Sequence, residues 1–199
     1  MLLLLGAVIG LLAGILTGGS LRGLASVRIR WPMLLILLAA LLVKEMGVFG
    51  PLARSDLTPW LFAASNLLLV GWAVAHRRQL RGVELVAVGI ALNLVVIAAN
   101  GGHMPVSPAL AHQGPAQLVR EGVWGQYVLA GSSTRLGWLG DVLQLPPPVS
   151  RIFPQAYSPG DLVSLAGMVL VLFLLTRRRP ESAQTSRLQF PDGGVGDRA

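Results

Sequence analysis

The sequence contains no cysteine, which excludes disulfide bridges, thiolate nucleophiles, iron–sulfur clusters and thiolate zinc sites. Charged residues are scarce as well, at 13% of 199 residues, and aromatic residues make up only 6%. What remains is strongly apolar, with 53% hydrophobic residues and a mean hydropathy of +0.65. Because one soluble core of this size does not bury so much apolar surface, the composition indicates a membrane protein.

Lysine is also nearly absent, since Lys44 is the only one among 16 basic residues. The arginines form three clusters, each beside a long apolar run: Arg22, Arg28 and Arg30; Arg77, Arg78 and Arg81; and Arg177, Arg178 and Arg179. The net charge of +7 is therefore concentrated at the ends of the apolar runs, where positive charge determines which side of the membrane a loop faces. We expect membrane lipids as partners of this chain, and no nucleic acid.

Five apolar segments are long enough to cross about 30 Å of hydrocarbon as helices. They are residues 2–17, 32–49, 59–75, 83–99 and 161–176. The sequence therefore predicts an all-α integral membrane protein with one transmembrane domain, residues 1–176. We expect the first segment to be a retained helix and not a signal peptide, because basic residues follow it and none precedes it.

The direction of each segment follows from placing the three arginine clusters in the cytoplasm. The N-terminus then lies outside, residues 100–160 form a long outer loop, and the C-terminus lies inside. Residues 177–199 contain too few large apolar residues to fold alone, so we predict a flexible cytoplasmic tail. The predicted location is the plasma membrane, crossed several times.

Small residues recur with helical spacing in the first segment. Gly6, Gly10, Gly14 and Gly18 are four residues apart and share one stripe, which allows another backbone to approach closely. We favour a contact with another helix of the same chain, and the alternative is a homo-oligomer or a partner helix packed on the same glycines.

Few polar residues fall within the apolar segments, where an ionisable group suggests a function. Asn93 and Asn100 are two helical turns apart and share one face of the fourth segment, while Asn66 lies in the third. Hydrogen bonds between helices are the ordinary role of such amides. Lys44 is predicted in the outer third of the membrane, where it either snorkels to the surface or neutralises an outer carboxylate.

The outer loop is where we expect function to reside, because its length greatly exceeds what joins two neighbouring helices. Its glycine and proline content predicts a lid or a re-entrant layer over the helices. Val119, Val123 and Tyr127 repeat every four residues, with Trp124 beside them. This spacing predicts a short amphipathic helix on the outer interface, within residues 116–129.

Two carboxylates stand out at the outer face, Asp141 and Asp161. Two aspartates held close together can share one proton and activate water. The structural alternative for Asp141 is a turn residue. For Asp161 it is a capping box, with Ser158 as the N-cap and Pro159 at the first helical position.

Three motifs occur together: Asn100-Gly101-Gly102-His103-Met104-Pro105-Val106, then Leu139-Gly140-Asp141, then Ser158-Pro159-Gly160-Asp161. In this combination the chain resembles a family of small bacterial multi-pass membrane proteins of unknown function, domain of unknown function 5317. The resemblance covers nearly all of the chain before the tail. It implies a bacterial plasma-membrane protein and supplies no activity.

The end of the chain is also similar, more faintly, to the lipoprotein signal peptidases. The similarity rests on the two aspartates and on the helix that continues as Leu162-Val163-Ser164-Leu165-Ala166-Gly167. It implies that Asp141 and Asp161 form an aspartate dyad near the outer membrane face. The chain departs from that family before the second aspartate, where the family has an asparagine and an alanine.

Three functions follow from these observations. The one we favour is a non-catalytic module that binds a ligand or lipid, or assists transport, through a polar site at the outer face. The alternatives are an intramembrane aspartate-dyad hydrolase and an accessory subunit of a membrane complex. The candidate site residues are Lys44, Asn93, Asn100, Asp141 and Asp161. His103 and His112 have no zinc-ligand spacing, so we expect neither a metal nor another cofactor.

Overall fold

The computed structural model describes residues 2–27, 31–49, 55–111, 119, 125–152 and 154–178. Most of these residues are helical. The long helices are α1 (Leu2–Leu16), α2 (Trp31–Phe49), α3 (Thr58–His76), α4 (Val83–Ala99) and α7 (Pro159–Thr176). They lie on the five segments for which the sequence predicts helices, and their ends differ from the predicted ends by at most two residues.

Two of the described helices, α3 and α7, combine the length and the hydropathy needed to cross a membrane, with mean values of 1.4 and 1.9. Three shorter described stretches are apolar helices as well: Leu2–Leu16, Pro32–Val43 and Val83–Ala99. The length and composition of these helices thus describe a helical protein with several apolar helices.

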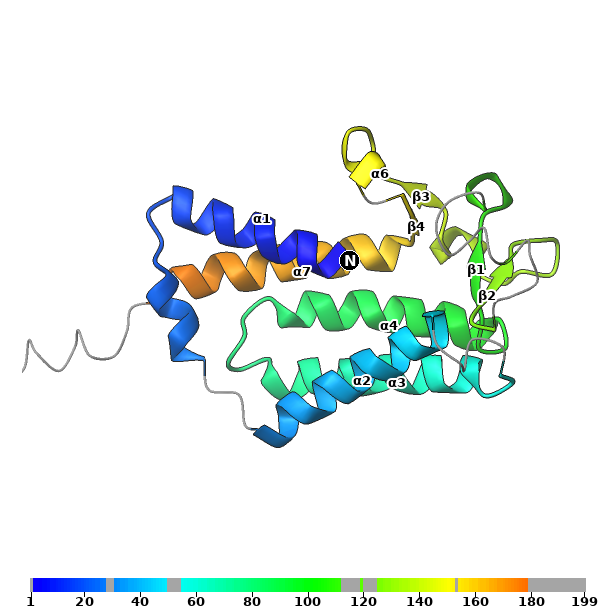
Figure 1. The fold of residues 1–199 in the computed structure, drawn as a ribbon, viewed down its shortest axis with the longest axis horizontal. Coiled ribbons are helices and arrows are strands. Elements are labelled where there is room, and N and C mark those ends of the chain that lie inside the picture. Colours follow the sequence, from blue (N-terminus) through cyan, green and yellow to red (C-terminus); the bar gives the residue numbers. More distant parts are fainter. Residues whose placement is uncertain are drawn as a thin grey trace, which may run out of the picture.

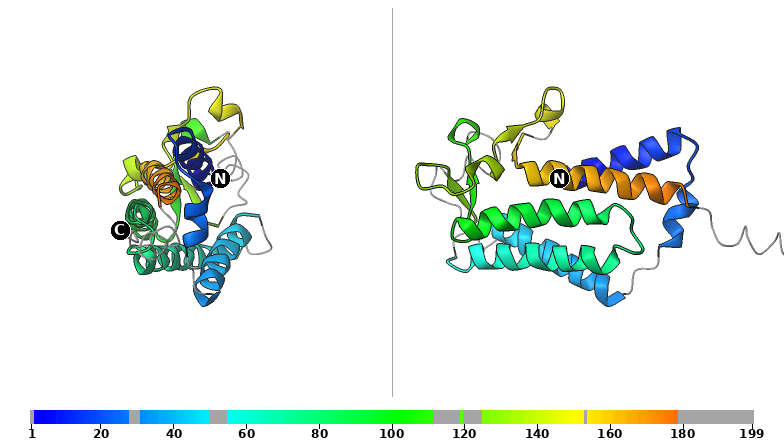
Figure 2. Two further views of the ribbon diagram at one scale, coloured as in Figure 1. Left: turned by 90° about the vertical axis from the view of Figure 1, so that its left-hand side faces the viewer. Right: turned by 180° about the vertical axis from the view of Figure 1, so that it is seen from behind.

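The long helices lie side by side in the order α1, α7, α4, α3, α2, which is not their order in the chain (Figure 1). Viewed from one end, they follow an open arc with α1 and α2 at its two ends (Figure 2). The helices α1, α3 and α7 run in one direction and α2 and α4 in the other. The last helix, α7, is therefore inserted between the first helix and the fourth.

The glycine stripe of α1 faces α7 inside the chain. A Cβ atom on Gly6 would lie 2.9 Å from the carbonyl oxygen of Leu165, and one on Gly10 would overlap the backbone of Val169. Gly14 lies equally close to Thr176, whereas Gly18 has open space around it. The first three glycines therefore make the helix contact that we favour, and a homo-oligomer remains a prediction.

The apolar core is largest between α2, α3, α4 and α7, where Leu69, Ala73, Val86 and Val171 are buried. The outward faces of these helices are apolar too. Exposed examples are Leu12 on α1, Leu42 on α2, Leu68 on α3, Val95 on α4 and Leu170 on α7. A water-soluble protein rarely exposes apolar faces of this extent, which agrees with the membrane composition of the chain.

One end of the helices is covered by a layer of short strands and turns (Figure 1). Strand β1 (Met104–Val106) pairs in parallel with β2 (Tyr127–Leu129), and β3 (Leu143–Gln144) pairs antiparallel with β4 (Ala156–Tyr157). Short helical turns connect them: η3 (Pro108–Leu110), η4 (Gly137–Leu139) and α6 (Val149–Ile152). We call residues 104–157 of the described chain the strand layer.

The strand layer corrects the prediction of an all-α protein. The amphipathic helix expected within residues 116–129 falls mostly outside the described residues. Val119 is described and is helical, but the last part, Tyr127–Leu129, is strand β2. Aromatic and β-branched residues favour a pleated strand, and the backbone of these three residues pairs with β1. Pairing with a distant segment thus overrides a helical spacing that rests on few residues.

The opposite end of the helices carries the described arginines of all three clusters. A 3-10 turn, η1 (Leu21–Ser26), contains Arg22, and Arg77, Arg78 and Arg81 lie between α3 and α4. Arg178, which follows α7, donates a hydrogen bond to the carbonyl of Gln79. The arginine clusters and the strand layer therefore mark opposite ends of the molecule.

The packing of α1 on α7 makes a testable prediction at Gly10. We expect Gly10→Ala to lower the free energy of unfolding in detergent by about 1–3 kcal/mol, because the added methyl group forces the two helices apart. The matched control is Gly71→Ala on α3, where a Cβ meets nothing within 4 Å. This variant should be neutral or up to about 1 kcal/mol more stable, because alanine favours the helix. Equal effects of the two changes would contradict the packing.

Candidate functional site

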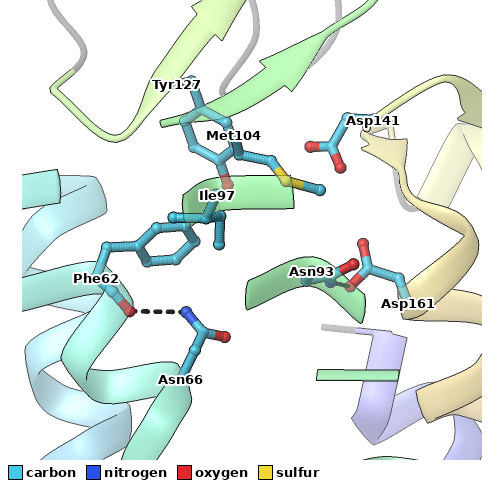
Figure 3. Close-up of a pocket in the computed structure, with 8 residues that line it drawn as sticks. All are labelled: Phe62, Asn66, Asn93, Ile97, Met104, Tyr127, Asp141 and Asp161. Atoms are coloured by element: carbon cyan, nitrogen blue, oxygen red, sulfur yellow. Dashed lines mark hydrogen bonds between the residues drawn. The ribbon is translucent and has the colours of Figure 1, made fainter. Parts of the chain in front are cut away.

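A pocket of about 70 Å³ lies between the strand layer and the ends of α3, α4 and α7. Eight residues line it: Phe62, Asn66, Asn93, Ile97, Met104, Tyr127, Asp141 and Asp161. Figure 3 shows Asp141 reaching in from the strand layer and Asp161 from the start of α7. The structure therefore brings the two predicted aspartates, twenty residues apart in the sequence, to one pocket.

Asp161 occupies the third position of the capping box that the sequence predicts. The Ser158 hydroxyl accepts a hydrogen bond from the Asp161 backbone N–H at 2.9 Å, and Asp161 Oδ2 accepts one from the Ser158 N–H at 3.2 Å. The other carboxylate oxygen, Oδ1, accepts a hydrogen bond from Asn93 Nδ2 at 2.9 Å. Both oxygens of Asp161 thus hold the start of α7 in place.

Asn93 connects α4 to that cap. Besides donating to Asp161, it accepts a hydrogen bond from the Ser158 hydroxyl through Oδ1 at 2.8 Å. The two partners fix the orientation of the amide, because a carboxylate accepts a hydrogen bond only from the NH₂ group. Asn93 is therefore one member of a three-residue network, together with Ser158 and Asp161.

The network depends on an unusually close approach of α4 and α7. A Cβ atom on Gly160 would lie 2.5 Å from the carbonyl oxygen of Gly89, and one on Gly89 would overlap the side chain of Ser164. The helices come into contact at these glycines because neither residue has a side chain. The short side chain of Asn93 can then reach the first turn of α7.

Asp141 is held by its backbone and not by a helix. Its N–H donates to the carbonyl of Pro105 at 2.9 Å, and its carbonyl accepts from the N–H of Ser107 at 3.0 Å. These bonds form an isolated parallel bridge with Val106, so Asp141 adds a third strand-like segment beside β1. The expected turn residue is therefore part of the strand layer, and only 8% of it is exposed.

Asn66 supplies a polar group on the α3 side of the pocket. Its Nδ2 donates to the Phe62 carbonyl at 2.8 Å, and since a carbonyl only accepts, the amide oxygen must point the other way. Figure 3 shows this oxygen turned away from that carbonyl. Asn66 is only 3% exposed, and its oxygen has no hydrogen-bond partner among the described residues.

The remaining lining is mostly apolar. Phe62 and Tyr127 contribute aromatic rings whose centroids lie 6.3 Å apart at an angle of 49°. Ile97 and Met104 belong with Phe62 to a second, smaller apolar cluster below the strand layer. The pocket thus has one wall of rings and aliphatic groups and another of carboxylate and amide oxygens.

Two of the predicted site residues lie elsewhere. Asn100 does not line the pocket: its Nδ2 donates to the carbonyl of Arg135 at 2.8 Å, and its Oδ1 accepts from the Arg135 N–H at 3.0 Å. It fastens a loop of the strand layer to the end of α4. The side chain of Lys44 lies outside the described residues.

A tyrosine next to the cap is buried. Tyr157 ends β4, immediately before the N-cap, and only 4% of it is exposed. Burial, and the neighbouring Asp161 carboxylate, raise the pKa of Tyr157 above its ordinary value of 10.0. The phenol therefore stays neutral at physiological pH and adds no negative charge beside the pocket.

Sequence reasoning missed five of the eight residues that line the pocket, among them Asn66 and Tyr127. Asn66 was noted only as a packing amide, because the sequence does not show which side of α3 faces the strand layer. Tyr127 was assigned to a helix, although its place beside a run of β-favouring residues was a signal for a strand. Among the described residues, no group of three or more histidine, aspartate or glutamate side chains converges as a metal site would require, and His112 lies outside them.

The fold and the pocket define a class: a helical protein with apolar helices, capped at one end by a strand layer that closes over a small polar pocket. The chain belongs to the family of unknown function DUF5317, whose family model matches residues 24–173. This confirms the family suggested by the three motifs, all of which lie within the matched residues. No curated protein and no solved structure matches the chain.

The capping network makes a prediction at Ser158. We expect Ser158→Ala to lower the free energy of unfolding by about 1 kcal/mol or more, because the cap is lost and Asn93 loses its donor. The matched control is Ser107→Ala in the same layer, whose side chain makes no hydrogen bond with a described residue. This change should stay within about 0.5 kcal/mol of the wild type. Both variants can be compared by unfolding in detergent, and an equal loss in both would refute the network.

Proposed function

We propose that the chain crosses the bacterial plasma membrane five times, with its N-terminus outside and its C-terminus inside. The alternating directions of α1, α2, α3, α4 and α7 support this topology, since consecutive spans must reverse. The described arginines of the three clusters gather at one end of the helices, which is the distribution expected of a cytoplasmic face, and only Arg135 and Arg151 of the described arginines lie in the strand layer. The strand layer and its pocket then lie at the outer face.

This topology can be tested with introduced cysteines, because the chain has none of its own. Ser132→Cys places a thiol on an exposed turn of the strand layer, and Gln79→Cys places one at the arginine end. In intact bacterial cells a membrane-impermeant maleimide should label the first variant and not the second. After permeabilisation it should label both. The reverse pattern would invert the topology, and labelling of both in intact cells would rule out the five spans.

We further propose that the protein is a non-catalytic binding module, and that the pocket between the strand layer and the helices is its binding site. The observation that carries this proposal is the pocket lining, to which Asn66 contributes an amide oxygen that has no hydrogen-bond partner among the described residues. That oxygen can accept a hydrogen bond from water or from a bound molecule.

The size of the pocket limits what enters it. A volume of about 70 Å³ accommodates a few waters or one small group. Drug-sized ligands occupy pockets of roughly 300–1,000 Å³. The bound molecule is thus small, or it inserts only one end while the remainder stays among lipids or in water.

A hydrolase is the second candidate, because Asp141 and Asp161 line the same pocket. Catalysis by an aspartate dyad requires one carboxylate to hold a proton and the other to accept one. Asp161, however, accepts hydrogen bonds at both oxygens, and these bonds hold the first turn of α7. Its structural role favours binding over proton transfer.

Native mass spectrometry of protein extracted in mild detergent tests the binding module. We expect wild-type protein to carry a small molecule or lipid that Asp141→Asn releases, because the amide removes a negative charge from the pocket. Asp56→Asn, on an exposed turn, is the control and should keep it. A wild-type spectrum identical to that of Asp141→Asn would contradict the proposal. Recovery of a cleaved molecule would indicate the hydrolase instead.

A further inference from the structure

We infer that the arginine end of the molecule binds the head groups of anionic phospholipids. Six described arginines form this surface, which we call the arginine surface: Arg22, Arg77, Arg78, Arg81, Arg177 and Arg178. The site is separate from the pocket, and it rests on the proposed function only in that the helices lie in a membrane. The inference follows from the way three segments meet, from their charge, and from the apolar side chains beside them.

The segments that carry the arginine surface are in contact, although they are far apart in the sequence. The N–H of Ser20, the N-cap of η1, donates to the Thr176 carbonyl at the end of α7, at 2.8 Å. Arg178 joins the same end of α7 to the turn between α3 and α4 through its hydrogen bond to the Gln79 carbonyl. Both views show these segments together at one end of the helices (Figures 1 and 2). A topology signal requires only that each loop be basic, so the meeting of all three is an additional feature of the fold.

The charge of this end is strongly positive. Among the described residues here, six arginines face one acidic residue, Glu84, which leaves five positive charges in excess. The Glu84 carboxylate accepts a hydrogen bond from the Gly82 N–H at 2.9 Å, at the start of α4. None of the six arginines forms an ion pair with a described residue. Like charges gathered on one surface repel one another, and an anionic partner removes that repulsion.

Arg177 shows how charge and apolar surface are combined. Its guanidinium carbon lies 5.2 Å from the centroid of the Phe173 ring, and Nη2 donates to the Thr17 hydroxyl at 2.5 Å. These contacts hold the guanidinium where the ends of α1 and α7 meet, next to Leu16, which is 84% exposed. A phosphate bound here would accept hydrogen bonds from the remaining N–H groups of Arg177, while an acyl chain would cover Leu16.

The same combination recurs beside the α3–α4 turn. Val74 lies one helical turn before Arg78 and Leu85 one turn after Arg81, and both apolar side chains are exposed. A nucleic acid or an acidic protein would neutralise the arginines but leave these apolar faces in water. A phospholipid carries a phosphate and acyl chains in one molecule, so it covers both. Basic clusters at the cytoplasmic ends of membrane helices bind anionic lipids in this way.

Native mass spectrometry of the full chain in a neutral detergent tests the inference, with phosphatidylglycerol and phosphatidylcholine added in equal amounts. The two lipids differ in mass, so their adducts are counted separately. We expect phosphatidylglycerol adducts to exceed phosphatidylcholine adducts by about tenfold, because only the first lipid carries a net negative charge. Inorganic phosphate at the same concentration should not displace the lipid, because it cannot cover the apolar faces.

A matched pair of double variants locates the site. Arg77→Gln with Arg81→Gln removes two exposed arginines of the arginine surface and should abolish most of the tenfold preference. Arg135→Gln with Arg151→Gln removes two exposed arginines of the strand layer and should keep it. Both double variants change the net charge equally, so the comparison separates a defined site from a general attraction between the whole protein and an anion.

A measurement on the wild type alone covers the case in which a variant does not fold. Raising ammonium acetate from about 0.1 M to about 1 M shortens the Debye length from roughly 10 Å to roughly 3 Å. The excess of phosphatidylglycerol adducts should therefore fall several-fold, while phosphatidylcholine adducts stay nearly constant. An excess that does not depend on salt would contradict binding through the arginines.

Other results would overturn the inference as well. They are equal adducts of the two lipids, displacement of phosphatidylglycerol by inorganic phosphate, and an equal loss of preference in both double variants. Asp141→Asn distinguishes this site from the pocket and should keep the phosphatidylglycerol adducts. If Asp141→Asn released them, the lipid would belong to the pocket, so the arginine surface would fail while the proposed binding function stood.

Discussion

The contact between α4 and the first turn of α7 is the interaction on which the rest of the structure depends. Gly89 and Gly160 bring the two backbones together, and Asn93 then closes a network with Ser158 and Asp161. This network fixes where α7 begins and therefore where β4, which directly precedes it, meets β3. Together with the two hydrogen bonds between Asn100 and Arg135, the network fixes the position of the strand layer and of the pocket beneath it relative to the helices.

The two aspartates are held in different ways, which bears on their chemistry. Asp161 is fixed through its side chain, by hydrogen bonds that form the cap of a helix. Asp141 is fixed through its backbone, by the bridge to Val106, which leaves its carboxylate directed into the pocket. One carboxylate thus has mainly a structural task, and the position of the other is set by the backbone. In a binding site of the kind that we propose, such preorganisation would lower the cost of binding.

The sequence predicted those parts of the structure that depend on local patterns. Helix positions follow from apolar runs, and the cap of α7 follows from Ser158 and Asp161 three residues apart. The strand layer was not predictable in this way, because three-residue strands carry almost no periodicity and β1 pairs with a segment more than twenty residues away. Asn93 and Asn100 show the same limit. The two residues share a helix face, yet Asn93 lines the pocket and Asn100 binds a loop. The difference depends on the segment that packs above each residue, and the sequence pattern does not show that segment.

The position of the pocket explains how a polar site is tolerated in so apolar a chain. Within hydrocarbon, every backbone group needs a partner and every isolated charge is costly. Here the strands pair with one another, and the Asp161 carboxylate accepts two hydrogen bonds, from Asn93 Nδ2 and from the Ser158 N–H. With the proposed topology, the pocket lies at the outer boundary of the membrane, where water and lipid head groups are both within reach.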